Sequence, residues 1–152
     1  MHSAEDIVRL FGDMLYRAAL SLVWCPEDAE DMVQDCLVKW LTARPEFDSD
    51  EHEKAWLLRV VMNLSKNLLA SAAHRTRADL LDIYPAEEPE EVWLLEEVAK
   101  LPEGERSAVH LFYYEGYKTA EIASILGEKE STVRSWLHRA RKKLKKQLEE
   151  QE

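Results

Sequence analysis

Apolar residues recur at intervals of three and four along most of this chain, which is the spacing of one face of an α-helix. The first such segment extends from about Glu5 to Trp24. Its predicted inner face consists of Val8, Phe11, Leu15, Ala19 and Leu22. Pro26 separates this helix from a second one, which runs to about Ala43 and is followed by Pro45. The inner face predicted for the second helix consists of Val33, Leu37, Trp40 and Leu41.

The middle of the chain predicts a third helix and then a break. Residues 46–54 predict an acidic loop that merges into this helix, which ends near His74. Its apolar positions are Trp56, Leu57, Val60, Val61, Leu64 and Leu68. Residues 79–91 interrupt the periodicity with Pro85, Pro89 and a cluster of acids, and therefore predict a linker.

Two further helices are predicted after the linker. One spans about Glu90 to Leu101. Pro102 is expected as the first residue of the next, because its missing N–H costs nothing there. That helix reaches about Glu115, and Gly116 ends it.

The carboxyl-terminal segment predicts a short helix and a long helix separated by a tight turn. Thr119 caps the short helix and Gly127 stops it, whereas Ser131 and Thr132 cap the long one. The inner face of the long helix is predicted as Val133, Leu137, Ala140, Leu144 and Leu148. Two helices joined by a short turn containing glycine form the helix-turn-helix pattern.

The composition agrees with an all-α fold of two small helical domains joined by an acidic linker. The 152 residues are 46% hydrophobic and include only four glycines. No apolar stretch reaches the length of about 18 residues that a membrane helix needs, and the amino terminus lacks a secretory signal, so a cytoplasmic location without membrane insertion is expected. Cys25 and Cys36 are expected to be small buried hydrophobes, and neither a metal site nor a cofactor is expected.

Charge is distributed unevenly along the chain, whose net charge is −10. Residues 1–78 hold 9 basic and 13 acidic side chains, residues 79–105 hold 1 and 10, and residues 106–152 hold 10 and 7. Within Arg134–Lys146, seven of thirteen residues are basic and none is acidic. Because affinity for DNA depends on the local field, the carboxyl-terminal helix is compatible with DNA binding despite the acidic total. A solvated amphipathic helix is the alternative interpretation of this basic run.

Five short segments of the chain carry recognisable motifs. They are Ala29–Asp35, with Trp40 after it, Trp56–Asn67, Leu101–Glu103, the Glu121-Ile122-Ala123 scaffold and Ser131–Arg141. The first two resemble conserved region 2 of the extracytoplasmic-function sigma factors, a family of bacterial transcription-initiation factors, and the last three resemble region 4 of the same family. The similarity covers nearly the whole chain, with the segments in the order of the family.

The resemblance implies a role for each group of residues. Residues expected to dock on a coiled coil of the largest polymerase subunit are Glu30, Asp31, Gln34 and Asp35. Residues expected to hold the melted −10 element are Trp56, Arg59, Asn63, Lys66, Asn67, His74, Arg75 and Arg77. Residues expected to contact the −35 element are Ser131, Thr132, Arg134, Ser135, His138, Arg139, Arg141 and Lys142. Aromatic rings, cations and amides are the groups that single-strand binding needs, and arginine can pair with guanine in the major groove.

The expected domains are residues 1–78 for region 2, 79–91 for the linker and 92–152 for region 4. By resemblance, the partners are the two largest subunits of core RNA polymerase, promoter DNA and a separate anti-sigma factor. The linker is expected to stay extended inside the polymerase, where its acids would mimic nucleic acid until the transcript displaces them.

Two departures from the family pattern affect the expected readout. Trp136 stands where a basic residue is usual, and Glu130 stands at the position before Ser131-Thr132 where the family usually has glycine. The loop at 48–54 is also rich in acids, although in the family it borders the pocket for a flipped base.

Two other functions compete with an initiation factor. A stand-alone helix-turn-helix regulator would leave the acidic face at 30–35 and the face from Trp56 to Asn67 unexplained. A protein-interaction module would fit the negative charge but not the basic run Arg134–Lys146. An enzyme is not expected, because no phosphate-binding loop, nucleophile motif or metal-ligand spacing is present.

Overall fold

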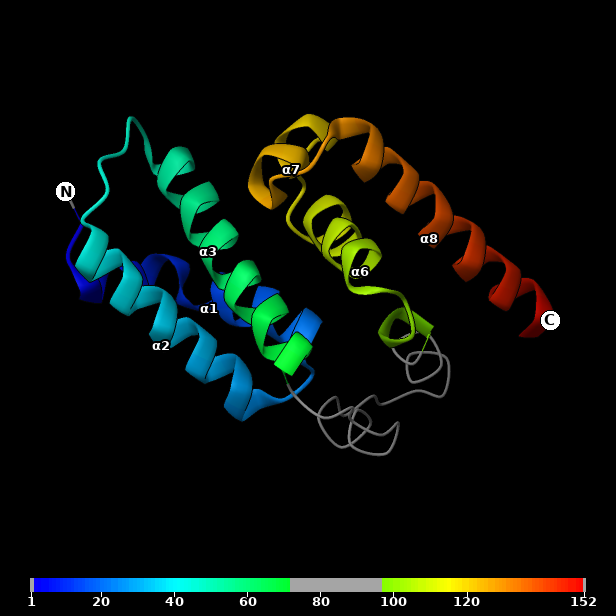
Figure 1. Ribbon diagram of the computed structural model, residues 1–152, viewed down its shortest axis with the longest axis horizontal. Coiled ribbons are helices and arrows are strands. Elements are labelled where there is room, and N and C mark those ends of the chain that lie inside the picture. Colours follow the sequence, from blue (N-terminus) through cyan, green and yellow to red (C-terminus); the bar gives the residue numbers. More distant parts are fainter. Residues whose placement is uncertain (1, 72–96, 152) are drawn as a thin grey trace. The chain divides into compact units, whose positions relative to one another are not determined.

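The computed structural model describes residues 2–71 and 97–151, and in these ranges all the regular elements are helices (Figure 1). The all-α prediction is therefore confirmed. The chain divides into two compact units, residues 1–73 and 74–152. The finer domain boundaries, and the predicted linker at 79–91 that lies outside the described residues, stay predictions.

Helix α1 (Ala4–Val23) begins at a reciprocal capping box. The backbone N–H of Asp6 donates to Ser3 Oγ at 3.2 Å, and the backbone N–H of Ser3 donates to Asp6 Oδ2 at 2.9 Å. The bond from the Ser3 backbone is the main cause of the lowered pKa of the Asp6 carboxyl. The helix ends at Trp24, whose left-handed φ of 54° turns the chain toward the next helix.

The first unit is a bundle of α1, α2 (Pro26–Ala43) and α3 (Asp50–Ser71), each packed against the other two (Figure 1). Burial of apolar surface holds these helices together. The largest fully buried side chains of this unit are Ile7, Leu15, Leu22, Val23, Leu57, Leu58, Val61 and Met62.

The predicted inner faces of this bundle were partly wrong. Val8 is 51% exposed, and α2 buries Ala29, Met32 and Cys36 while Leu41 is 45% exposed. On α3, the predicted Leu57 and Val61 are buried, and the buried line also includes Leu58, Met62 and Ser65, whereas the predicted Val60, Leu64 and Leu68 are only half-buried. The acidic segment also differs, because α3 begins at Asp50 within the predicted loop, with acids in its first turn where the helix dipole favours them.

The second unit contains α6 (Glu103–Val109), the short π-helix η1 (His110–Tyr114), α7 (Thr119–Leu126) and α8 (Glu130–Gln151). Its core is formed by Leu111, Ile122, Val133, Leu137 and Ala140, so the predicted inner face of α8 is confirmed over its first half. The last turns of α8 extend beyond α7 (Figure 1), and Leu148 there is 53% exposed, which corrects its predicted burial.

Helix boundaries in this unit lie one residue from several predictions. Pro102 is the N-cap of α6 and not its first residue. Lys118, not Thr119, caps α7, because the Lys118 backbone N–H donates to Glu121 Oε1 at 2.9 Å. Helix α8 begins at Glu130, before the predicted caps Ser131 and Thr132.

The remaining predictions are confirmed or untested, except for the predicted burial of Cys25, which is wrong. Gly116 and Gly127 terminate their helices with φ of 75° and 68°, as predicted. Residues 97–99 are helical, and the earlier part of the predicted 90–101 helix lies outside the described residues. Both cysteines are free: Cys36 is buried as predicted, but Cys25 is only half-buried at the start of α2.

Candidate functional site

Helix α2 presents an acidic face to solvent. Glu30, Asp31, Gln34 and Asp35 are all exposed, and they lie away from the buried positions of the same helix. Val38 and Leu41 continue this face at helical spacing and are 58% and 45% exposed. Large apolar side chains left in water beside acids are typical of a docking surface. Sequence reasoning missed Val38 and placed Leu41 in the core, because the buried positions of α2 are known only from its packing.

Helix α3 carries the predicted single-strand face. Arg59, Asn63 and Asn67 are exposed and lie four residues apart, so they form one line along the helix. Lys66 is half-buried beside this line. His74, Arg75 and Arg77, which were predicted to extend this path, lie outside the described residues.

Trp56 lies near the start of α3 and is half-buried. Its ring meets Phe47 edge-on, with centroids 5.8 Å apart. Phe47 belongs to the loop between α2 and α3, which also lines a pocket of about 590 Å³. The lining includes Trp40, Leu41, Arg44, Phe47, Asp48 and Glu53. The structure thus brings an aromatic-walled pocket to the acidic loop that the sequence had singled out.

Glu53 is a buried acid at the wall of this pocket. Its Oε1 lies 2.5 Å from His2 Nδ1, and its Oε2 accepts from Trp40 Nε1 at 3.2 Å. His2, Asp50 and Glu53 bring metal-ligand atoms within 4.8 Å of one another. Because both Glu53 oxygens already have hydrogen-bonding partners, the group is explained as a junction joining the amino terminus, α2 and α3.

Helix α8 carries the predicted duplex-reading face. Ser131, Arg134, Ser135, His138 and Arg139 are exposed, while Thr132 is half-buried. Arg134 Nη1 lies 3.0 Å from Glu130 Oε1, which also accepts from Thr119 Oγ1 at 3.0 Å. Glu130 therefore connects the start of α7 to a base-reading candidate on α8.

The basic residues farther along α8 differ in their surroundings. Arg141 donates to Tyr113 OH, and its guanidinium lies over Phe112, 5.2 Å from the ring centroid. Lys143 Nζ lies 3.0 and 2.9 Å from the two carboxylate oxygens of Glu105, whose side chain is buried. Lys142 is exposed between them. The basic run is thus divided between residues with partners inside the fold and residues that face solvent.

Two family models match this chain in the order of its two units. The model of Sigma-70 region 2 matches residues 7–75, and that of Sigma-70 region 4 matches residues 91–144. The ECF RNA polymerase sigma factor SigM of Mycobacterium tuberculosis is 30% identical over 97% of this chain and 78% of its own length. The chain belongs to the extracytoplasmic-function (ECF) sigma factors.

Other ECF sigma factors have similar coverage. SigL of Mycobacterium tuberculosis is 32% identical over 90% of this chain and 84% of its own length. Among solved structures, CnrH in complex with the cytosolic domain of CnrY has a TM-score of 0.74 and 28% identity, and the alignment covers 98% of this chain and 89% of CnrH. The sigma factor RpoE, in complex with the anti-sigma factor NepR from Bartonella quintana, shares the fold, with a TM-score of 0.68, 24% identity and coverage of 95% and 96%.

Membership of the ECF sigma factors makes this chain a transcription-initiation factor and not an enzyme, as the sequence predicted. In the part of the chain that the structure describes, none of the helices is long and apolar enough to span a bilayer.

Proposed function

We propose that this sigma factor directs core RNA polymerase to promoters through three surfaces, one each on α2, α3 and α8. The observation that carries the proposal is the exposure of each predicted polar face on a helix whose opposite side is buried. Residues that already face solvent can bind a partner while the helix that carries them stays folded.

The face of α2 docks on the largest polymerase subunit. Asp31, Gln34 and Asp35 supply charge and hydrogen bonding for a basic partner helix, and Val38 and Leu41 add apolar area beside them. Charge selects the partner and its orientation, while burial of the two apolar side chains contributes affinity.

The face of α3 and the pocket hold the melted −10 element. Arg59 and Lys66 attract phosphates, and Asn63 and Asn67 offer both donors and acceptors to base edges. The pocket beside Trp40 and Phe47 receives a flipped base, which aromatic walls stabilise by stacking. Asp48 in the loop before α3 and Asp50 at the start of α3 repel phosphate, so the pocket takes the base while the nucleic-acid backbone passes along the cations of α3.

Helix α8 reads the −35 duplex from the major groove. Ser131, Arg134, Ser135, His138 and Arg139 project toward base edges, while Lys142 attracts phosphate. Arg141 contributes to the same basic surface from its place over Phe112. The carboxyl-terminal unit also meets the flap of the second-largest subunit.

A separate anti-sigma factor regulates this sigma factor, and the protein works in the cytoplasm with the polymerase. The proposal of a regulator is supported by two relatives of the same fold, each solved in a complex, CnrH with CnrY and RpoE with NepR.

The deciding experiment is co-elution of the purified chain with bacterial core RNA polymerase on a sizing column. Asp31→Arg/Gln34→Ala is compared with wild type and with Asp13→Arg, a charge reversal at an exposed position of α1. Wild type and Asp13→Arg are expected to co-elute, and the α2 variant is expected to elute alone with an unchanged circular dichroism spectrum.

Two results would contradict the proposal. If the α2 variant still co-elutes, the docking surface lies elsewhere. If wild type does not co-elute but binds duplex DNA, the chain acts as a stand-alone helix-turn-helix regulator.

A further inference from the structure

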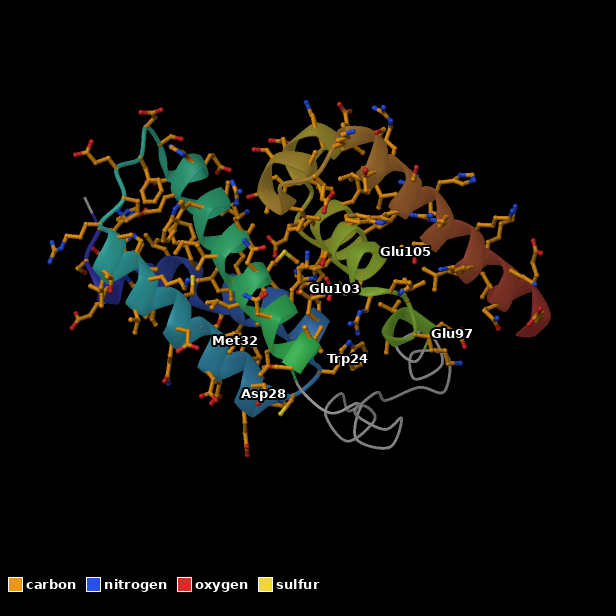
Figure 2. The ribbon with its side chains drawn as sticks, in the orientation of Figure 1. Trp24, Asp28, Met32, Glu97, Glu103 and Glu105 are labelled. Atoms are coloured by element: carbon orange, nitrogen blue, oxygen red, sulfur yellow. The ribbon has the colours of Figure 1, made fainter. Side chains whose placement is uncertain are left out.

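Helix α8 is held to α6 at two consecutive residues, Gly104 and Glu105. A β-carbon added to Gly104 would lie 2.6 Å from Cζ2 and 2.7 Å from Cε2 of Trp136, so the indole lies directly on the Gly104 backbone. The next residue, Glu105, is buried and binds Lys143 Nζ with both oxygens, at 3.0 and 2.9 Å. Glu105, labelled in Figure 2, belongs to α6, and its carboxylate pairs with Lys143 of α8. We call Trp136–Gly104 and Lys143–Glu105 the two-point brace.

The brace lies on the α6 side of α8, where Arg139 is the nearest of the reading residues, three residues from Trp136 and four from Lys143. Trp136 and Lys143 are seven residues apart, two turns along one side of the helix, with the buried Ala140 between them. Arg134 and His138 are two residues from Trp136 in either direction and therefore point to the opposite side. A group on the α6 side can orient the reading face without touching DNA.

An apolar stripe alone fixes the position of a helix less sharply than a polar contact. Val133, Leu137 and Ala140 bury the inner face, but burial is non-directional and permits a small roll or slide. The brace fixes the orientation of α8 at two points. The indole of Trp136 packs where only glycine leaves room, and Lys143 forms an ion pair with the buried Glu105. Hydrogen bonds to base edges depend on such placement, because they tolerate only a few tenths of an ångström.

We propose that Trp136 and Lys143 are positioning residues of the DNA-reading helix. They hold α8 on Gly104 and Glu105, and neither side chain contacts the promoter. The proposal rests on the proposed reading of the −35 element by α8. It also places Lys143, one lysine of the basic run, in an internal ion pair with Glu105.

The first test compares two adjacent lysines. Holoenzyme is assembled from the full chain and bacterial core polymerase, and the probe is a promoter fragment selected from random DNA by the wild-type holoenzyme. Binding is measured over a range of salt concentrations, with the selected −35 element and with a scrambled one. Lys142→Ala is expected to reduce the slope of log affinity against log salt by about 1, as loss of a phosphate contact does.

Lys143→Ala is expected to leave the slope of log affinity against log salt unchanged. It is expected to lower the preference for the selected −35 element by about tenfold, which is the size of effect that loss of a contact such as Lys143–Glu105 typically has. Lys143→Arg keeps the pair with Glu105 and is expected to retain the preference. An equal loss of slope in Lys143→Ala and Lys142→Ala would overturn the assignment of Lys143.

The second test is a double-mutant cycle between α6 and α8. Gly104→Ala forces a β-carbon against the indole and is expected to lower the −35 preference by about tenfold. In the Trp136→Ala background, Gly104→Ala is expected to lower the −35 preference by less than about twofold, because the indole ring is absent. Equal effects in both backgrounds would show that the indole does not act through Gly104 and would overturn the proposal.

Urea unfolding is measured for the wild type, the two single variants and the double variant of this cycle. If the two substitutions are coupled in the free energy of unfolding but do not change the −35 preference, the contact contributes to stability only and the positioning role is overturned. If the wild-type holoenzyme does not prefer the selected −35 element, the proposed reading by α8 is wrong and the positioning role falls with it. Coupling in urea would persist in that case, so the two failures are distinguishable.

Discussion

Cys36 shows how one side chain can take its properties from burial alone. It is completely buried on α2, and its Sγ lies 3.6 Å from the carbonyl oxygen of Leu57 on α3. Loss of hydration raises the pKa of the Cys36 thiol to about 12, and the positive charge of Lys39 offsets only part of this shift. Because thiolate is the reactive form, Cys36 should be chemically inert in the folded chain.

We predict that a thiol reagent such as DTNB at pH 8 does not modify Cys36 in the folded Cys25→Ser variant and modifies it promptly in urea. The half-buried Cys25, tested in Cys36→Ala, serves as the comparison. The pKa of the Cys36 thiol in the folded chain lies above the reference value of 9.0, so the folded chain holds this proton more tightly than the unfolded chain does. The contribution of the thiol to the free energy of unfolding is therefore fully present below pH 9 and is lost as pH rises toward 12. Rapid modification of folded Cys36 would contradict its burial.

Glu130 is an acidic residue at the start of α8, the helix proposed to read DNA. It pairs with Arg134 across one turn, at the amino-terminal end of the helix proposed to enter the groove. An exposed pair of this kind contributes little to stability, so its main effect should be on binding. Glu130 repels phosphate and holds a cation that otherwise would be available to DNA.

We predict that Glu130→Gln strengthens holoenzyme binding to a selected promoter by about two- to fivefold, because one acid is removed and Arg134 is released. Fluorescence anisotropy at two salt concentrations measures the change. Glu128→Gln, an exposed acid outside α8, is the matched control and should have a smaller effect. Weaker binding by Glu130→Gln would indicate instead that Glu130 accepts a bond from a base, as acids do from cytosine.

Individual elements were predicted more accurately than the direction in which they face. Helix α2 was located correctly, but its buried side consists of the small residues Ala29 and Cys36 with Met32, not of its larger apolar residues. A pattern counts large side chains as core, whereas the side chains that α2 buries are set by how it packs against α1 and α3. Val38 and Leu41 are therefore exposed, and they lie on the proposed docking face.

The exposure of the proposed functional faces was nevertheless predictable where the spacing of the polar residues places them on one side of a helix. Arg59, Asn63 and Asn67 share one side of α3 because they are four residues apart, whatever the register of the core. The partners of Arg141 and Lys143 were not predictable. Each lies on α8 and pairs with a residue of α6 or η1, and such contacts depend on tertiary packing.

Helix α7 supplies a prediction about capping. Glu121 accepts a bond from the backbone of Lys118 and so satisfies a donor that the helix leaves free. We predict that Glu121→Ala lowers the free energy of unfolding by about 1 kcal/mol in urea. Ser124→Ala, at an exposed position of the same helix, should change it less. Equal effects of the two substitutions would show that the cap contributes nothing.

At the scale of the whole molecule, charge is segregated along the chain. The net charge of −10 arises largely from residues 79–105, whereas residues 106–152 carry an excess of three basic side chains. The proposed DNA-reading helix therefore retains a positive local field although the protein as a whole is acidic. The order of the functional segments could be predicted because each motif is local in sequence, and the two family models match in that order.

The acidic segment at 79–91 lies outside the described residues, and its charge alone motivates the last prediction. It holds Asp79, Asp82, Glu87, Glu88, Glu90 and Glu91 and no basic residue. We propose that this run competes with a nucleic-acid chain for cationic surfaces of the polymerase. If the nascent transcript must displace it, replacing the six acids by their amides should weaken that competition and change the yield of abortive products. The measurement is the ratio of short to full-length RNA from a selected promoter, with Glu149→Gln/Glu150→Gln as a control for lost charge elsewhere. An unchanged ratio would mean that the linker acids do not lie in the path of the RNA.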